Sequence, residues 1–138
     1  MPSYLHYDQL RALGVRLVIN MRYSRGPETD RADAPIQLLW LRTIDSPFFP
    51  MPIDKLMQGA RAALETIREG GSIYVHCAYG RHRSVVMGAC ILHAQGMSVK
   101  DAAKLIKARR PAADPDVYYM KSRILKFAQQ WKLEGIPA

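Results

Sequence analysis

The chain has 138 residues, of which 49% are hydrophobic and 23% charged, and its formal net charge at pH 7 is +8. This length and composition fit one domain with a sizeable core, and two cysteines are too few for a disulfide scaffold. The positive charge predicts either attraction to anionic partners, such as phosphorylated substrates, nucleic acid or anionic lipid, or simply a basic, soluble surface.

Cys77 and Cys90 are expected to be reduced thiols in a cytoplasmic, monomeric protein. No apolar run follows the first ten residues, and no stretch approaches the roughly 18 apolar residues that a membrane-spanning helix requires. Neither a signal peptide nor a membrane span is therefore expected. The positive residues are scattered rather than gathered in a run, so a nucleic-acid-binding tail is not indicated, although the charge leaves nucleic acid open as a partner.

The first half of the chain alternates short helices and strands. The pattern predicts a short helix that ends at Gly14 and a strand over 15–20, rich in β-branched residues. A polar loop over 21–35 leads to a second buried strand over 36–41. Three prolines make 42–52 another loop. Apolar residues at helical spacing then predict an amphipathic helix that starts at Ile53 and ends at Gly70-Gly71.

The second half begins with a strand over 72–77, which is expected to be buried on both faces of the sheet. A nearly all-apolar helix follows and is expected to end at Gly96. Ser98 is expected to cap the next helix. A last helix runs to about Trp131, and its inward stripe is Val117, Met120, Ile124 and Ala128. Alternating strands and helices predict an α/β domain with a largely parallel sheet flanked by helices. Ligands of such sheets bind at the carboxyl ends of the strands, where Cys77 lies.

The residues HCAYGRHRS, from His76 to Ser84, connect a predicted strand to a predicted helix. Gly80 permits a tight loop, and successive N–H groups in such a loop form an anion site that the helix N-terminus extends. Arg83 can offer two parallel N–H donors to phosphate oxygens. The positive charge of Arg83 and of the helix N-terminus also favours the thiolate form of Cys77, which makes this residue a nucleophile. The alternative is a buried strand-end cysteine with an unrelated arginine nearby.

The segment VHCAYGRHRS resembles the H-C-x5-R-S/T signature of cysteine-dependent protein phosphatases. The segments LGVRLVIN, LRTIDSP and IKARRPAADPDVYYMKSRILKFAQQW extend the resemblance to small, atypical dual-specificity phosphatases. The resemblance implies a single catalytic domain over 1–138 with a phosphatase-type phosphate-binding loop between a strand and a helix. It also implies that the protein needs no metal and no cofactor.

The resemblance assigns roles to the residues of the loop. Cys77 would attack phosphorus and Ser84 would hydrogen-bond the cysteine sulfur to ease its departure. The phosphate oxygens would be held by the Arg83 side chain and by the backbone amides of Ala78, Tyr79, Gly80, Arg81, His82 and Arg83. His76 would help to order the loop, or would merely fill the strand end.

The general acid of this family is an aspartate on a loop some thirty residues before the cysteine. Asp45 lies 32 positions before Cys77, so it is the expected acid; the alternative is that it caps the bend at Ser46. Asp54 is the alternative candidate for the general acid, but its position favours a role as a negative charge in the first turn of a helix. Asp114 and Asp116 are expected to start the last helix, with a supporting role near the site left open.

Arg81 and His82 are unusual for the family, and either they favour substrates with additional phosphates or acidic neighbours, or they face solvent. Tyr79 is expected to form one wall of the entrance, and Cys90 to lie in the core. Only six or seven residues precede the first predicted helix, so part of the usual sheet edge is expected to be absent or short. Because no long recognition loops precede Tyr4, the pocket is expected to be shallow and to tolerate phosphoserine and phosphothreonine besides phosphotyrosine.

The sequence thus predicts a phosphomonoester hydrolase with a cysteinyl-phosphate intermediate, of the protein tyrosine or dual-specificity type. Its partner would be a phosphorylated protein. The alternatives are a phosphatase for a phosphoinositide or an RNA 5′-phosphate, a phosphate-binding module without turnover, and a sulfurtransferase.

Overall fold

A computed structural model describes residues 7–24, 26, 30, 35–77, 82–115 and 117–134. In chain order its elements are α1 (Tyr7–Ala12), β1 (Val15–Asn20), β2 (Gln37–Trp40), α2 (Ile53–Arg68), β3 (Ser72–His76), α3 (Arg83–Ala94), α4 (Val99–Arg109) and α5 (Tyr118–Glu134).

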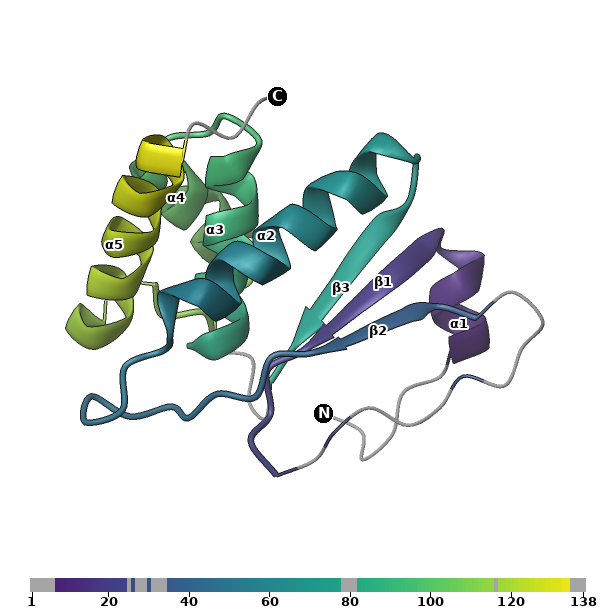
Figure 1. The fold of residues 1–138 in the computed structure, drawn as a ribbon, viewed down its shortest axis with the longest axis horizontal. Helices are drawn as coiled ribbons and strands as arrows, with labels where there is room; N and C mark the ends of the chain where they lie inside the picture. The colour runs from purple at the N-terminus through teal and green to yellow at the C-terminus, as the bar shows by residue number, and fades with distance from the viewer. Residues whose placement is uncertain are drawn as a thin grey trace.

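The described strands form one parallel sheet in the order β2-β1-β3 (Figure 1). Ile19 of β1 pairs with Leu39 on one side and with Val75 on the other. The crossover from β2 to β3 contains α2, as parallel pairing requires. The predicted α/β fold with a parallel sheet is therefore confirmed.

The predicted burial of the second and third strands is wrong. β2 is an outer strand of the described sheet with no fully buried residue, and Trp40 is exposed. β3 is the other outer strand, and only its last residue, His76, is buried. Apolar runs of this length do not distinguish an outer strand from a central one, because the neighbours that cover a strand come from elsewhere in the chain.

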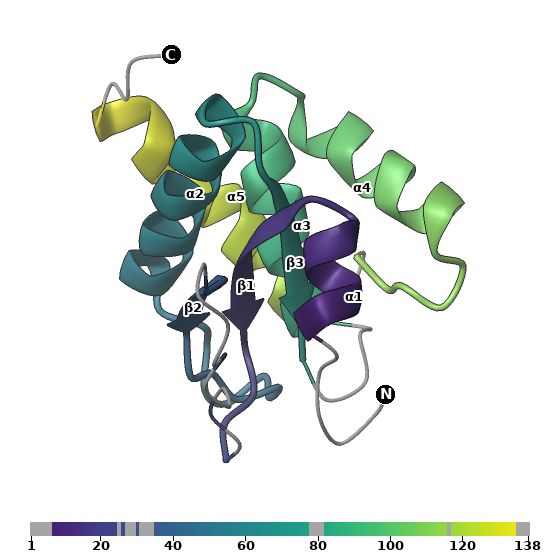
Figure 2. The ribbon, with the colours of Figure 1, turned by 90° about the vertical axis from the view of Figure 1, so that its right-hand side faces the viewer.

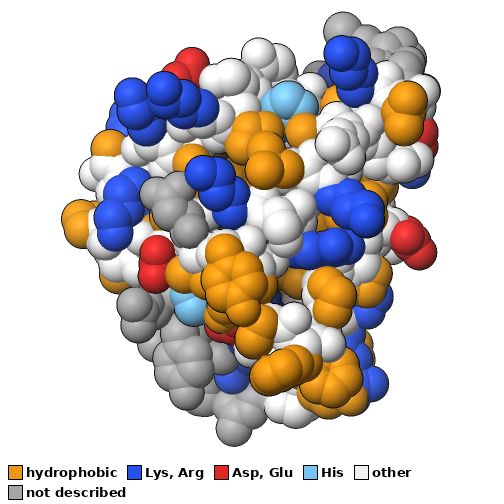
Figure 3. All heavy atoms as spheres, turned by 90° about the vertical axis from the view of Figure 1, so that its left-hand side faces the viewer, with side chains coloured by type: hydrophobic (Ala, Val, Ile, Leu, Met, Phe, Trp, Pro, Cys, Tyr) orange, Lys and Arg blue, Asp and Glu red, His pale blue; other side chains and the backbone are white. Residues whose placement is uncertain are grey.

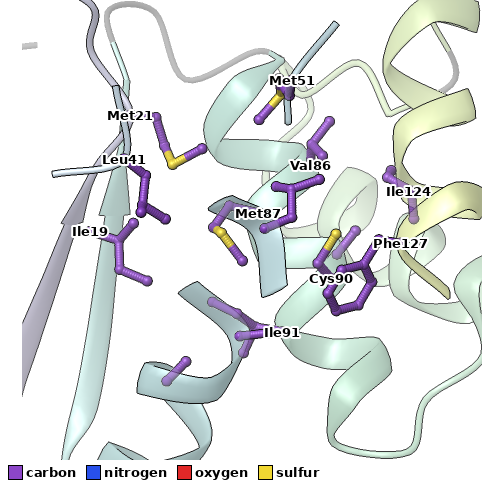
Figure 4. Packing of buried hydrophobic residues seen from close by; sticks show 14 of the residues in the cluster. Ile19, Met21, Leu41, Met51, Val86, Met87, Cys90, Ile91, Ile124 and Phe127 are labelled. Carbon is purple, nitrogen blue, oxygen red and sulfur yellow. The ribbon is translucent and has the colours of Figure 1, made fainter. Parts of the chain in front are cut away.

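The helices divide between the two faces of the sheet. Figures 1 and 2 show α2 and α3 against one face, with α4 and α5 beyond them, and α1 on the opposite face. The larger core lies between the sheet and α2 and α3, where Ile19 and Leu41 face Met87 (Figure 4). A smaller cluster under α1 contains Val15, Val18 and Ile36.

Local signals set the helix ends as predicted. Ser98 Oγ accepts a hydrogen bond from the Asp101 amide at 3.1 Å and so caps α4. Gly70 follows α2 with φ of +85°, a conformation that glycine adopts without strain. On α5, Met120 and Ile124 are buried as predicted, but Phe127 is the third buried residue, whereas Ala128 is only partly buried.

The net charge of the chain at pH 7 is +8. Figure 3 shows Lys and Arg side chains spread among hydrophobic and neutral ones over one face. Within the described part of the chain, no helix has both the length and the hydrophobicity that crossing a membrane requires.

Candidate active site

The candidate site lies where the carboxyl ends of the three parallel strands meet. The Met21 amide, just after β1, donates to the His76 carbonyl at 2.8 Å, and the Leu41 amide donates to the Asn20 carbonyl at 2.8 Å. Cys77 directly follows β3 and is only 2% exposed. The strand ends therefore hold Cys77 at the edge where ligands of such sheets bind.

Ser84 lies in the first turn of α3, directly beside the cysteine sulfur. The Cys77 Sγ and Ser84 Oγ atoms are 3.3 Å apart and in hydrogen-bond contact. The Ser84 hydroxyl can donate to a thiolate at Cys77, and α3 directs the free N–H groups of its first turn toward the same end. The structure thus brings Cys77 and Ser84 together, as the sequence predicts.

Arg83, the first residue of α3, is 8% exposed and anchored by a single nitrogen. Its Nη1 donates to the Thr43 carbonyl at 2.9 Å and to the Met21 carbonyl at 3.3 Å. The Met21 carbonyl also accepts from Thr43 Oγ1 at 2.9 Å. The buried Nε of Arg83 has no hydrogen-bond partner in the described part of the chain. The guanidinium is therefore fixed in place through Nη1, and its Nε is a buried donor that the described residues do not satisfy.

Asp45 is brought to the same site from the segment after β2. Its Oδ2 lies 2.8 Å from His82 Nδ1, and His82 immediately precedes Arg83. The bend after Asp45 is capped by Ser46 instead, whose Oγ accepts from the Phe48 amide at 3.1 Å. The rival aspartate, Asp54, lies in the first turn of α2.

Tyr119 is a residue of the site that the sequence analysis missed. Its hydroxyl donates to Asp45 Oδ1 at 3.0 Å and lies 3.5 Å from His82 Nδ1. Burial, followed by the hydrogen bond to Asp45, raises the pKa of Tyr119, which keeps the phenol protonated. Tyr119 is 74 positions from Asp45, and no local pattern in the sequence joins them.

His82 does not face solvent, which was one of the two alternatives; that it favours substrates with additional phosphates or acidic neighbours stays a prediction. Its side chain is 18% exposed and turned toward Asp45 rather than toward solvent. Its Nε2 lies 3.9 Å from Asp114 Oδ2, which gives Asp114 a place at the edge of the site. Residues 78–81, which hold the remaining predicted phosphate-binding amides and Arg81, lie outside the described residues, as does Asp116.

His76 is buried behind Cys77, and its ring stacks on Tyr74 with centroids 5.5 Å apart. Neither ring nitrogen has a hydrogen-bond partner among the residues the structure describes. Burial, and secondarily the charge of Arg22, lowers the pKa of His76 to about 4, so the ring is neutral at pH 7. A cavity of about 210 Å³ beside it is lined by His76, Cys77 and Ser84, among others. The expected role of His76 in ordering the loop stays a prediction.

Cys90 has the structural role that the sequence predicts. Its side chain is fully buried in α3 beside Phe127 (Figure 4), and burial raises the pKa of its thiol. No disulfide joins it to Cys77.

Comparison with protein families gives a match over residues 2–130 to the model described as "Dual specificity phosphatase, catalytic domain". The chain is 33% identical over 115 residues to dual specificity phosphatase 28 of Homo sapiens, an alignment that covers 79% of this chain and 60% of that protein. It is 36% identical over 58 residues to dual specificity protein phosphatase 1 of Arabidopsis thaliana, covering 41% of this chain and 29% of the relative. It thus spans less than two thirds of each relative.

Solved structures share the fold. The crystal structure of human DUSP28 matches with a TM-score of 0.78 at 26% identity, covering 93% of this chain and 87% of that one. The crystal structure of "PTPMT1 in complex with PI(5)P" matches with a TM-score of 0.78 at 22% identity, covering 99% of this chain and 93% of that one. At that identity the second match indicates the fold alone.

Proposed function

Because this chain belongs to the family of dual specificity phosphatase catalytic domains, we propose that it hydrolyses phosphomonoesters through a phosphorylated Cys77. One observation supports this proposal most strongly. The Ser84 hydroxyl contacts the cysteine sulfur, while Arg83 and His82, the residues just before Ser84, bind Thr43 and Asp45. Nucleophile, anion-binding arginine and acid thus converge on one helix N-terminus.

In the first step, the thiolate of Cys77 attacks phosphorus. The S–P bond forms as the bond from phosphorus to the leaving oxygen breaks, and that oxygen takes the proton of the Asp45 carboxyl group. Arg83, held through Nη1 by two carbonyls, presents its remaining N–H groups to the phosphoryl oxygens. Because the arginine is already fixed, it stabilises the developing charge without reorganising.

In the second step, water attacks the phosphocysteine. The oxygen–phosphorus bond forms, the S–P bond breaks, and a proton of the water passes to the Asp45 carboxylate. The Ser84 hydroxyl, 3.3 Å from the sulfur, donates to the departing thiolate and lowers the cost of its charge. Inorganic phosphate leaves, and Cys77 and Asp45 return to their starting protonation states.

The substrate class that the family favours is a phosphorylated protein, on tyrosine or on serine and threonine. A phosphoinositide is the second candidate. Phe48 and Phe49, 85% and 61% exposed, follow Asp45 closely on the same segment and offer an apolar surface beside the site. The net charge of +8 suits an anionic headgroup, and PTPMT1, a protein of the same fold, has a crystal structure in complex with PI(5)P.

Turnover of an aryl phosphate under reducing conditions tests the chemistry. We expect hydrolysis that vanadate inhibits and that Cys77→Ser abolishes. Hydrolysis that survives in Cys77→Ser contradicts the proposal, as does thiosulfate turnover without phosphatase activity.

A panel of phosphopeptides, inositol lipids and triphosphorylated RNA tests the substrate. Higher kcat/KM on phosphopeptides supports the protein substrate. A preference for inositol lipids favours the second candidate, and the variants Phe48→Ser and Phe49→Ser should then lower kcat/KM on lipid more than on a soluble aryl phosphate.

A further inference from the structure

Four side chains from four segments gather at the proton-donating end of the site. Asp45 comes from the segment after β2, His82 from the start of α3, Asp114 from the segment after α4, and Tyr119 from the first turn of α5. The side chains of Asp45 and His82 are 29% and 18% exposed, so water reaches them only partly. The proposed mechanism uses only Asp45 of these four.

Both oxygens of Asp45 are engaged. Tyr119 donates its hydroxyl proton to Oδ1 at 3.0 Å, and His82 Nδ1 lies 2.8 Å from Oδ2. The rings of His82 and Tyr119 meet edge to face, with centroids 5.9 Å apart. Because the Tyr119 hydroxyl occupies Oδ1, a further proton of the cluster can be held between Oδ2 and Nδ1.

A proton held there can lie on either of the two atoms. A carboxyl group on Asp45 can donate to neutral Nδ1, or an imidazolium at His82 can donate to the carboxylate; both forms hold the same number of protons. The second ring nitrogen of His82 lies 3.9 Å from Asp114 Oδ2, which is within ion-pair range but beyond hydrogen-bond distance, so an imidazolium at His82 would have a carboxylate near each ring nitrogen. Arg83 is the next residue in the chain, and Arg81 and Asp116 lie outside the described residues.

We propose that His82 is a positioning residue that holds Asp45 at the phosphate loop and stores the proton which Asp45 delivers, while Tyr119 orients the carboxyl group. This inference rests on the proposed phosphatase function. As the bond to the leaving oxygen breaks, that oxygen takes the carboxyl proton of Asp45. That proton reaches Asp45 from Nδ1 of His82, which is left neutral, and a proton of the attacking water then restores the pair.

The arrangement removes a difficulty that a lone aspartic acid faces. An isolated aspartic acid keeps its proton in only about one molecule in a thousand at pH 7, whereas histidine exchanges its proton near neutrality. A histidine in contact with Asp45 Oδ2 therefore gives the proton that the leaving oxygen requires a second place to be held.

The test compares two substrates that differ in their need for an acid. Phenyl phosphate has a poor leaving group and requires proton donation, whereas dinitrophenyl phosphate does not. His82→Asn keeps an N–H that can bind Asp45 Oδ2 but cannot carry an exchangeable charge. We expect the ratio of kcat for dinitrophenyl phosphate to kcat for phenyl phosphate to rise about tenfold or more at pH 7, and the alkaline limb of the phenyl phosphate profile to move about one pH unit lower.

Tyr119→Phe removes only the hydroxyl that orients Asp45. We expect it to raise the same ratio several-fold without moving the alkaline limb. The matched control is Tyr118→Phe, because the Tyr118 ring packs against Tyr119 but is exposed and makes no hydrogen bond to Asp45 in the described structure. Its ratio should equal that of the wild type.

The inference is overturned if His82→Asn has the same ratio of kcat for the two substrates and the same pH profile as the wild type. If that variant does not fold, imidazole NMR of the wild type decides instead: a hydrogen-bonded Nδ1 proton of His82 that is lost in Asp45→Asn supports the pair, and its absence from the wild type overturns it. Failure of the proposed function is distinct, because it removes Cys77-dependent hydrolysis of both substrates.

Discussion

Replacing Arg83 with lysine tests how the site holds a phosphoryl group. Arg83 Nη1 binds the Thr43 and Met21 carbonyls at 2.9 and 3.3 Å, and Nε has no hydrogen-bond partner in the described part of the chain. A lysine has one ammonium, which cannot reach these carbonyls and present paired donors to phosphate at the same time. Losing such a donor pair costs about 2.7–4 kcal/mol in the transition state, which lowers kcat about 100- to 1000-fold.

The same substitution removes hydrogen bonds that support the fold. Losing one charged hydrogen bond to a buried carbonyl should lower the free energy of unfolding by about 1.5–3 kcal/mol. Thr43→Val provides the matched control. It keeps the volume of the side chain and deletes only the 2.9 Å hydrogen bond to the Met21 carbonyl, at a cost of about 1 kcal/mol.

Steady-state kcat and urea unfolding of both variants separate the two effects. We expect Arg83→Lys to lose far more activity than its stability loss explains, and Thr43→Val to lose stability with only a small change in kcat. An Arg83→Lys enzyme within about threefold of wild-type kcat refutes the reasoning. An equal fall of kcat in both variants refutes it too, because the arginine would then act only through the fold.

Three further outcomes are expected. Asp45→Asn should slow phenyl phosphate about 100-fold or more and dinitrophenyl phosphate much less; equal effects would exclude Asp45 as the acid. Gly59→Ala should lower the free energy of unfolding by about 1–3 kcal/mol, because the new Cβ would lie 2.6 Å from Met87 Sδ, whereas Gly88→Ala, with 3.7 Å to its nearest neighbour, should be neutral or stabilising in urea unfolding. The pKa of His76 is about 4 in the folded protein and about 6.5 in the unfolded chain, so its contribution to the free energy of unfolding is complete above pH 6.5 and is lost as pH falls toward 4. Urea unfolding should therefore give a lower free energy of unfolding at pH 5 than at pH 7, and His76→Phe should reduce that difference.

The fold was predictable where the signal is local. The β-branched run over Val15–Asn20 is the observed β1, and the helical spacing after Pro52 places the start of α2 at Ile53. The positions of the strands within the sheet were not predictable. The segment around β2 is as apolar as that of β1, yet it lies at the edge of the described sheet, because strand order depends on packing between distant segments.

The residues of the candidate site were likewise predictable only where the sequence carries a local signal. Cys77, Arg83 and Ser84 lie within eight residues, so a strand followed by a helix brings them together. Asp45 could be proposed from its distance along the chain, but its contact with His82 depends on the tertiary structure. Tyr119 carries no local signal at all, because its hydroxyl has a role only once α5 packs beside the segment that holds Asp45.

The central claim is that Cys77 becomes phosphorylated during turnover. Rapid mixing of the protein with a ³²P-labelled aryl phosphate, a millisecond quench into denaturant and peptide mapping measure this directly. We predict label on the peptide that contains Cys77, formed no more slowly than product, and no label on the peptide that contains Cys90 or in Cys77→Ser. Full turnover with no label on Cys77 at any quench time would contradict the account.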